Sequence, residues 1–247
     1  DPANNHVYWI SDSTIFRANL EGSNVEPLGS GVPGGAVLDV ASHTYYWTQG
    51  DSLIKRASID GSGEEIVAEK PASPHTNLNP HAIKQLHLDA QGGFLYWRGA
   101  GISLPANIWR RPLTQDTIET ALIGFVAPAG LTVDPSSNHL CWTAGQGTVL
   151  RSDLDGTHVK EITQVACGIG SLTDIVFDGV RDRLYWGHTT DCPSYDIYRS
   201  DLMGEDVEIV QAFNQPWGLA LNAQKGELYW TEHAPYVLER AHIDTLF

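Results

Sequence analysis

A short motif ending in Tyr-Trp recurs along the chain, and this repetition constrains the fold more than any other feature. It is clearest in Gly226-Glu-Leu-Tyr-Trp-Thr231. Successive tryptophans of the motif are separated by 38, 50, 45, 44 and 44 residues. They are Trp9, Trp47, Trp97, Trp142, Trp186 and Trp230. This period fits a repeating unit of four short strands rather than a helical or leucine-rich solenoid.

Each repeat can be read as four strands, which we call a to d, with strand a innermost. Strand b carries the Tyr-Trp pair, whose side chains point to opposite faces, so we expect one ring to pack toward each neighbouring repeat. An Asp or Asn ends strand a, always seven residues before the residue that precedes the tryptophan. These residues are Asp1, Asp39, Asp89, Asp134, Asp178 and Asn222. The sequence therefore predicts an all-β fold, a six-bladed β-propeller of four-stranded antiparallel blades.

Strand c carries an arginine at the same position in every repeat. A residue present once per blade is expected to make the same local contact six times, such as a charge-assisted hydrogen bond to the neighbouring blade. We interpret this arginine as structural rather than as part of a basic ring that binds an anion. The set is Arg17, Arg56, Arg110, Arg151, Arg199 and Arg240.

The repeats are not all complete. Strands b and c occur six times, whereas strands a and d occur five times. We predict one propeller domain over residues 1–247, in which the inner strand of the first blade and the outer strand of the last blade are not found in the sequence. Propellers close to protect their strand edges, and closure would take about twenty more residues. Either a further segment of the same chain or a strand-donating partner would supply them.

The composition excludes some classes of partner. The chain has 30 acidic and 15 basic residues, a formal net charge of −15 at pH 7. Such a surface repels nucleic acid and anionic membranes. No apolar run approaches the ~20 residues of a membrane-spanning helix. We expect neither nucleic-acid binding nor membrane insertion.

Together these motifs resemble the YWTD repeats (class B repeats) of the low-density-lipoprotein-receptor family. The Leu-Tyr-Trp core, the strand and turn of the form Arg-Ala-x-Leu-Asp-Gly-Ser and the strand of the form Pro-x-Gly-Leu-Ala-Val-Asp carry the resemblance. It implies a six-bladed β-propeller that serves as an extracellular binding platform. One departure is systematic, because another residue replaces the Asp of the family's tetrad in every repeat. The replacements are Ser11, Gln49, Gly99, Ala144, His188 and Glu232.

The binding site is expected where polar or aromatic residues interrupt the repeat at one end of the blades, which we call the top face. The long insertions also lie in the loops of this face, and binding residues concentrate in such loops. We predict a pocket at the mouth of the propeller channel. Its residues are Lys84, Gln85, Thr173, Asp174, His188, Trp217, Glu232 and His233, with Asp191 beside them. The alternative is that these side chains only fill the channel mouth with hydrogen bonds and water.

The predicted function is that of a secreted or otherwise extracytoplasmic binding module for a protein, peptide or glycan. A lectin-like activity is one form of it, because Trp217 and Trp109 suit a sugar. The competing hypothesis is a metal-dependent propeller enzyme, similar to lactonases and lyases. It would hold a divalent metal on Asp174, His188, Glu232 and His233. Because no motif of a known catalytic class is present, we predict no enzymatic activity and no cofactor.

Three cysteines allow at most one disulfide bond. Cys167 lies between strands d and a, and Cys192 lies in the b–c loop of the same fifth blade, so both reach the top face. We predict a Cys167–Cys192 bridge, which implies an oxidising compartment. Cys141 replaces the strand b aromatic residue and is expected to be a buried free thiol.

This bridge can be tested by counting thiols. The denatured but unreduced protein should titrate with one free thiol for each chain, that of Cys141. A count of three would contradict the bridge.

Overall fold

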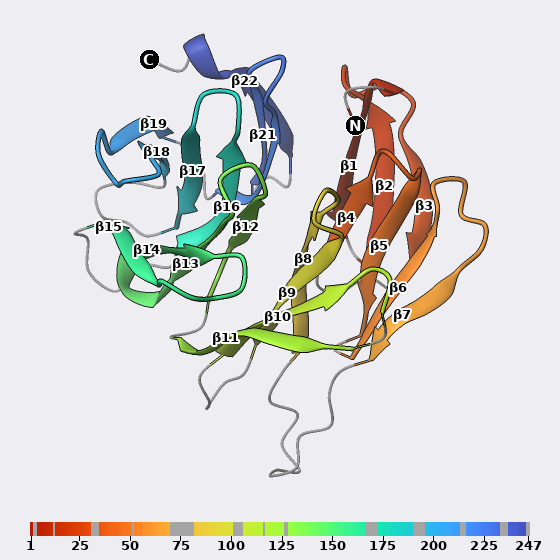
Figure 1. Cartoon of the computed structure of the whole chain (residues 1–247). Coiled ribbons are helices and arrows are strands. Elements are labelled where there is room, and N and C mark those ends of the chain that lie inside the picture. The colour runs from red at the N-terminus through yellow and green to blue at the C-terminus, as the bar shows by residue number, and fades with distance from the viewer. Residues whose placement is uncertain are drawn as a thin grey trace. The chain divides into compact units, whose positions relative to one another are not determined.

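The computed structural model describes residues 1, 4–11, 13–30, 35–50, 52–69, 82–100, 106–115, 117–125, 128–165, 172–189, 196–212, 216–232 and 237–245. The chain divides into two compact units, residues 1–124 and 125–247. Each unit holds three antiparallel sheets, numbered here 1 to 6 in chain order (Figure 1). These six sheets fit the six predicted blades.

The first unit contains sheets 1 to 3. Sheet 1 is formed by β1 (His6–Ser11), β2 (Thr14–Asn19) and β3 (Glu26–Ser30). Sheet 2 is formed by β4 (Ala36–Asp39), β5 (Thr44–Gln49), β6 (Leu53–Ser58) and β7 (Glu65–Glu69). Sheet 3 is formed by β8 (Ala82–Asp89), β9 (Phe94–Ala100), β10 (Ala106–Pro112) and β11 (Glu119–Phe125).

The second unit contains sheets 4 to 6. Sheet 4 is formed by β12 (Leu131–Asp134), β13 (His139–Ala144), β14 (Thr148–Asp153) and β15 (Lys160–Gln164). Sheet 5 is formed by β16 (Leu172–Asp178), β17 (Arg183–His188), β18 (Asp196–Asp201) and β19 (Glu208–Ala212). Sheet 6 is formed by β20 (Pro216–Asn222), β21 (Glu227–Glu232) and β22 (Leu238–His242).

Every sheet is a meander in which strands pair in the order of the chain, as hairpins a–b, b–c and c–d require. In the described part of the chain, sheet 1 contains strands b to d and sheet 6 contains strands a to c. The single domain over residues 1–247 stays a prediction.

The acidic residue at the end of strand a caps the turn that follows it. Asp178 Oδ1 accepts the backbone N–H groups of Val180 and Arg181 at 3.0 and 3.2 Å. Asp134 Oδ1 does the same for the two serines of its own turn, Ser136 and Ser137. A short carboxylate that bonds backbone groups two and three residues later holds the turn closed. This contact explains the fixed seven-residue spacing.

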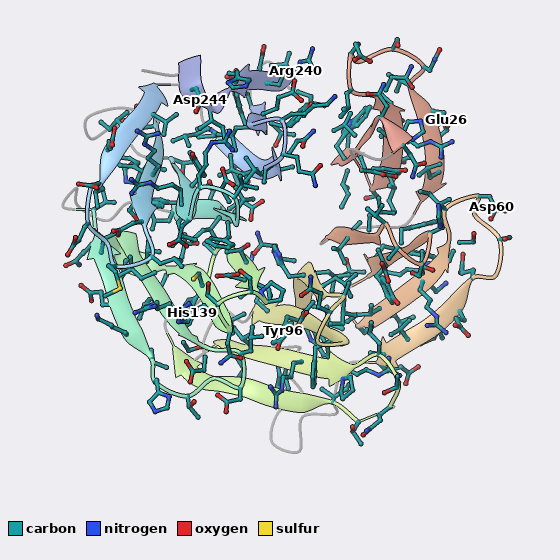
Figure 2. All side chains as sticks on the ribbon, turned by 45° about the horizontal axis from the view of Figure 1, so that its top comes forward. Glu26, Asp60, Tyr96, His139, Arg240 and Asp244 are labelled. Atoms are coloured by element: carbon teal, nitrogen blue, oxygen red, sulfur yellow. The ribbon has the colours of Figure 1, made fainter. Side chains whose placement is uncertain are left out.

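In four of the six repeats the strand c arginine pairs with a glutamate of its own sheet, rather than making the expected contact with the neighbouring blade. In three of these four the partner is a glutamate of strand d, as in the bidentate pair of Arg199 with Glu208 at 3.1 Å. Arg17 pairs with Glu26, which is labelled in Figure 2, and Arg56 pairs with Glu65. In the fourth, Arg240 pairs with Glu227 of strand b.

Sheet 4 differs from sheets 1, 2 and 5, because Lys160 replaces the strand d glutamate and is opposite Arg151. The guanidinium of Arg151 instead lies 3.0 Å from His139 Nε2 and 3.5 Å from Met203 Sδ of sheet 5. The repeated arginine therefore does not make one uniform contact.

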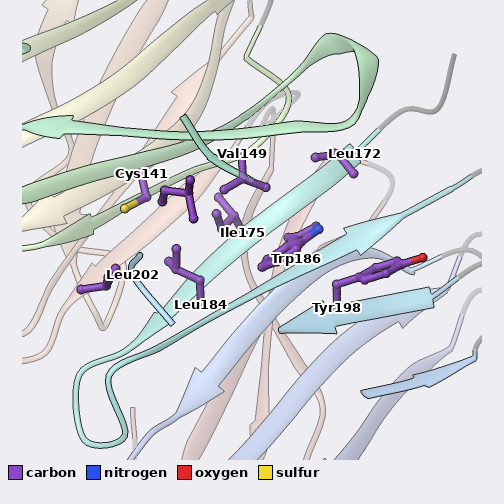
Figure 3. Packing of buried hydrophobic residues seen from close by; sticks show 9 residues of the cluster. Cys141, Val149, Leu172, Ile175, Leu184, Trp186, Tyr198 and Leu202 are labelled. Atoms are coloured by element: carbon purple, nitrogen blue, oxygen red, sulfur yellow. The ribbon is translucent and has the colours of Figure 1, made fainter. Parts of the chain in front are cut away.

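The Tyr-Trp pairs fill the spaces between sheets, as the sequence predicts. Trp186 packs toward sheet 4, in a cluster with Val149 (Figure 3) and Ile162. Tyr185 packs toward sheet 6, in a cluster with Trp230. Cys141 belongs to the cluster of Trp186 and is a buried free cysteine, as expected. Burial raises the pKa of its thiol to about 12, so it stays protonated at neutral pH. It acts as a small apolar side chain.

Two glycines in equivalent c–d turns differ in how closely a neighbouring sheet approaches them. Gly22 and Gly204 have φ values of +80° and +79°, so Ala would suffer the same left-handed strain at both. A Cβ at Gly22 would meet no atom within 4 Å, whereas one at Gly204 would overlap the Ile162 carbonyl oxygen of sheet 4. In chemical denaturation we expect Gly22→Ala to lower the free energy of unfolding by about 1 kcal/mol. Gly204→Ala should cost about 1–3 kcal/mol more, and equal losses would contradict the close approach.

Candidate functional site

Five predicted site residues lie at one end of sheets 5 and 6. They stand at the start of β16 and β20 and at the end of β17 and β21, because Leu172 pairs with His188 and Pro216 with Glu232. The five are Thr173, Asp174, His188, Trp217 and Glu232. A register irregularity follows each of these two pairs, so the inner strands are locally bent at the site.

The carboxylate of Asp174 links the inner strands of the two sheets. Its Oδ2 accepts the backbone N–H of Leu219 at 3.0 Å, and its Oδ1 accepts that of Ile175 at 3.0 Å. Asp174 occupies the column in which the neighbouring strands have Gly130 and Gly218, directly before the residue that pairs with the tryptophan. The polar side chain that replaces glycine therefore joins two backbones.

Threonine hydroxyls continue this link across three sheets. Thr143 Oγ1 accepts the N–H of Gly130 at 2.6 Å and donates to the carbonyl oxygen of Thr173 at 2.8 Å. Thr173 Oγ1 donates to the carbonyl oxygen of Pro216 at 2.9 Å. Each hydroxyl satisfies backbone groups that are buried or partly buried.

In sheet 5 the threonine hydroxyl comes from the inner strand instead of from strand b. Gly187 follows the tryptophan, where sheet 4 has Thr143, and Thr173 supplies the hydroxyl from the inner strand. A Cβ at Gly187 would overlap Thr173 Oγ1. The two positions therefore depend on each other.

Trp217 is the large apolar side chain at this site, and it is 54% exposed. The backbone beside it is fixed, because the N–H of Gly218 donates to Thr231 Oγ1 at 3.1 Å. Glu232 Oε1 lies 3.4 Å from the indole Nε1 of Trp230 on the same strand. The site therefore combines an exposed indole with a half-buried carboxylate on a hydrogen-bonded frame.

His188 faces a different environment. Its side chain is fully buried, and its ring contacts Tyr198 edge to face with centroids 5.9 Å apart. Two residues from Trp186, it lies on the face of β17 that packs toward sheet 4. It is opposite Asp196, which is also fully buried. The structure therefore groups Thr173, Asp174, Trp217 and Glu232, and places His188 behind them in the core.

The remaining predicted residues lie elsewhere or outside the described ranges. Lys84 and Gln85 are in β8 of the first unit, where Gln85 has a φ of +44° within a register irregularity and accepts a hydrogen bond from Arg98 Nε at 3.0 Å. His233, Asp191, Cys167 and Cys192 lie outside the described residues, so the predicted bridge stays a prediction.

Sequence reasoning missed Thr143 and Asp196. The sequence does not single out Thr143, because a threonine also follows the tryptophan in two other repeats, at Thr48 and Thr231. The fifth repeat offered a usable signal, because Gly187 follows its tryptophan where the fourth and sixth repeats have a threonine, and a threonine, Thr173, appears on the inner strand instead. Asp196 could have been found as the residue that pairs with the unusual His188 at the base of the b–c loop.

No group of three or more His, Cys, Asp or Glu side chains close enough to hold a metal ion occurs in the ranges that the structure describes. The metal hypothesis includes His233, which is outside them, and stays a prediction. No helix among these residues is long and apolar enough to cross a membrane.

Comparison with known proteins supports the resemblance that the repeats indicate. No family model matches the chain. It is 28% identical over 187 residues to low-density lipoprotein receptor-related protein 1 of Pyricularia oryzae, covering 66% of this chain and 60% of that protein. It is 29% identical over 210 residues to human low-density lipoprotein receptor-related protein 5, covering 81% of this chain and 12% of that protein. The chain thus spans less than two thirds of these relatives.

Solved structures confirm the fold class. A chain of a nidogen/laminin complex superposes with a TM-score of 0.78 at 17% identity, covering 98% of this chain and 90% of that one. An oligogalacturonate lyase in complex with manganese superposes with a TM-score of 0.68 at 12% identity, covering 95% of this chain and 69% of that one. The fold is that of a six-bladed β-propeller, and the resemblance to the YWTD repeats is confirmed.

Asp174 can be tested as the link between sheets 5 and 6. Asp174→Asn keeps the shape of the side chain but turns an NH2 group toward one of two backbone N–H donors. We expect the free energy of unfolding to fall by about 2 kcal/mol in urea denaturation followed by tryptophan fluorescence. The same change at the exposed turn residue Asp182 should alter it by less than about 0.5 kcal/mol. Equal effects would contradict the link.

Proposed function

We propose that this chain is an extracellular binding module that recognises a protein partner. The binding surface is formed by the starts of β16 and β20 and the end of β21, with Trp217 at its centre. The observation that carries the proposal is the exposure of Trp217, which is 54%, whereas Trp186 and Trp230 in the same sheets are buried. Exposed tryptophan is enriched in protein interfaces and in the residues that contribute most of their binding energy.

The surroundings of Trp217 support a preformed surface. Thr173 and Asp174 bond backbone groups of β20 on either side of Trp217, at Pro216 and Leu219. A partner therefore need not pay to order this strand, and lower ordering cost favours affinity. Glu232 and the net charge of −15 favour a partner with basic residues near its apolar anchor.

The relatives support the setting of this activity. Two of them are named as lipoprotein receptor-related proteins, and one similar structure is a complex of nidogen with laminin. We infer that this chain, like those receptors, acts outside the cytoplasm. The same surface would also accept a peptide segment or a glycan as its ligand.

No specific observation favours the enzymatic alternative. The similarity to the oligogalacturonate lyase is one of fold. The enzymatic hypothesis proposes four metal ligands in this chain. Of these, His188 is buried in the core, and both carboxylate oxygens of Asp174 accept backbone N–H groups.

The binding surface can be tested with arrays of extracellular proteins, peptides and glycans probed with the purified chain. A protein bound by the wild type should lose affinity by about thirtyfold or more with Trp217→Ala, because a central interface tryptophan contributes about 2 kcal/mol or more. The control is Val180→Ala in the turn at the opposite end of sheet 5, where Val180 is 64% exposed. Unchanged binding by the Trp217 variant, or equal loss in both variants, would contradict this surface. Signals on glycans alone would assign a lectin instead of a protein receptor.

A further inference from the structure

Two departures from the repeat pattern meet between the outer strands of sheets 4 and 5. The first is Lys160, which is opposite Arg151 where sheets 1, 2 and 5 have a glutamate that pairs with the arginine. Like charges directly opposite each other on antiparallel strands are destabilising. Among the residues that the structure describes, no carboxylate pairs with Lys160 or Arg151. A position that breaks a local rule in this way is a candidate for function.

The second departure is a set of three exposed apolar side chains in sheet 5. Met203 lies in the turn between β18 and β19, and Val207 and Ile209 follow it, with exposed fractions of 52%, 41% and 46%. In sheets 1, 2 and 4, at least one of the three equivalent positions carries a carboxylate. The equivalent residues are Glu21, Val25 and Pro27 in sheet 1, Asp60, Glu64 and Ile66 in sheet 2, and Asp155, Val159 and Glu161 in sheet 4. Among these four sheets, sheet 5 alone is apolar at all three positions.

The apolar side chains of β19 lie on the face toward sheet 4. Ile209 is opposite Tyr198, and Tyr198 is opposite Trp186. Tyr198 and Trp186 belong to the cluster that packs against sheet 4. Residues opposite each other share a face of the sheet, and so do residues two apart on one strand, so that Ile209 and Val207 also face sheet 4.

The two cations lie on the face of sheet 4 toward sheet 5. Lys160 is opposite Arg151, and Arg151 is opposite Cys141. Cys141 belongs to the same cluster as Tyr198. Arg151 Nη2 also lies 3.5 Å from Met203 Sδ, so the cations adjoin the apolar side chains. We call these five residues the outer patch: Arg151, Lys160, Met203, Val207 and Ile209.

Neighbouring acidic side chains do not neutralise the outer patch. Asp153 Oδ2 lies 2.8 Å from His158 Nδ1, and Asp206 Oδ2 lies 3.8 Å from Arg183 Nη2. Glu161 follows Lys160 on β15, so its side chain points to the opposite face of sheet 4. The outer patch is therefore a basic and apolar surface in a chain whose net charge is −15.

We propose that the outer patch is a second binding surface, which recognises an acidic segment of a partner protein that carries apolar side chains beside its carboxylates. The two cations form charge-assisted hydrogen bonds with the carboxylates, and the three apolar side chains cover those of the segment. The net charge of −15 repels nucleic acid and anionic membranes, so two cations suit a short acidic segment. This surface is separate from the one centred on Trp217, which the inner strands form.

A peptide array tests the class of partner. It carries short peptides that combine Glu with Leu, Ile or Val in different spacings within a Gly-Ser background, and a matched set in which Lys replaces every Glu. The purified chain should bind peptides of the acidic set and not their lysine counterparts, because only carboxylates pair with the two cations. The acidic peptide with the strongest signal is then labelled with fluorescein and titrated by fluorescence anisotropy.

Lys160→Glu is the decisive variant, because it introduces the residue that sheets 1, 2 and 5 have at this position. It should weaken binding of the labelled peptide by about tenfold or more, since the new carboxylate repels the peptide and pairs with Arg151. The same variant should raise the melting temperature by about 1–3 °C, because an opposite-charge pair replaces a like-charge pair. Weaker binding by a more stable protein separates recognition from a folding defect.

Two matched variants locate the apolar contact. Ile209→Ser should weaken binding of the same peptide by about fivefold, because less apolar surface is buried. Ile66→Ser is the equivalent change in sheet 2, where Ile66 is 55% exposed, and it should leave the affinity unchanged. Trp217→Ala should also leave it unchanged, which separates the outer patch from the proposed receptor surface.

Three results would overturn the proposal. The first is binding of the lysine peptides as strong as that of the acidic peptides, or no binding of either set. The second is an unchanged affinity of Lys160→Glu, or a lower melting temperature of this variant, which would make its loss of binding a folding defect. The third is an equal loss of affinity in Ile209→Ser and Ile66→Ser.

Discussion

The packing of the Tyr-Trp pair between neighbouring sheets is the interaction on which the structure depends. A sheet of four short strands exposes two apolar faces and cannot cover either alone. Strand b solves this problem because adjacent side chains point to opposite faces, so that Tyr185 and Trp186 serve two different neighbours. Burying a ring of ~150–250 Å2 at ~25 cal/mol per Å2 contributes about 4–6 kcal/mol. The rest of each repeat is then free to vary.

The fold could be predicted because the interactions that form each repeat are local in sequence. Hairpin turns, the Asp that caps them and the alternation of strand b all act within a few residues, as Asp178 does for its own turn. The site was harder to predict because it depends on which way a side chain faces. His188 and Glu232 occupy equivalent positions two residues after the tryptophan, yet the first is fully buried and the second half-buried. Sequence spacing does not determine what covers each position.

The arginines of strand c show why a repeated residue does not imply a repeated contact. Arg199 pairs with a glutamate of strand d, Arg151 turns to His139 and Met203 because a lysine replaces that glutamate, and Arg240 pairs with Glu227 of strand b. The guanidinium accommodates all three because its donors point in several directions. The conclusion that these arginines are structural needed only the periodicity, whereas their partners depend on strands that differ between sheets.

Two contributions to binding at the proposed surface centred on Trp217 respond differently to salt. Removing the Trp217 indole from water contributes an amount that depends little on ionic strength. The attraction between Glu232, the net charge of −15 and a basic partner is instead screened as salt rises and the Debye length falls below about 10 Å. Salt dependence of the affinity therefore separates the apolar contribution from the electrostatic one, before any variant is made.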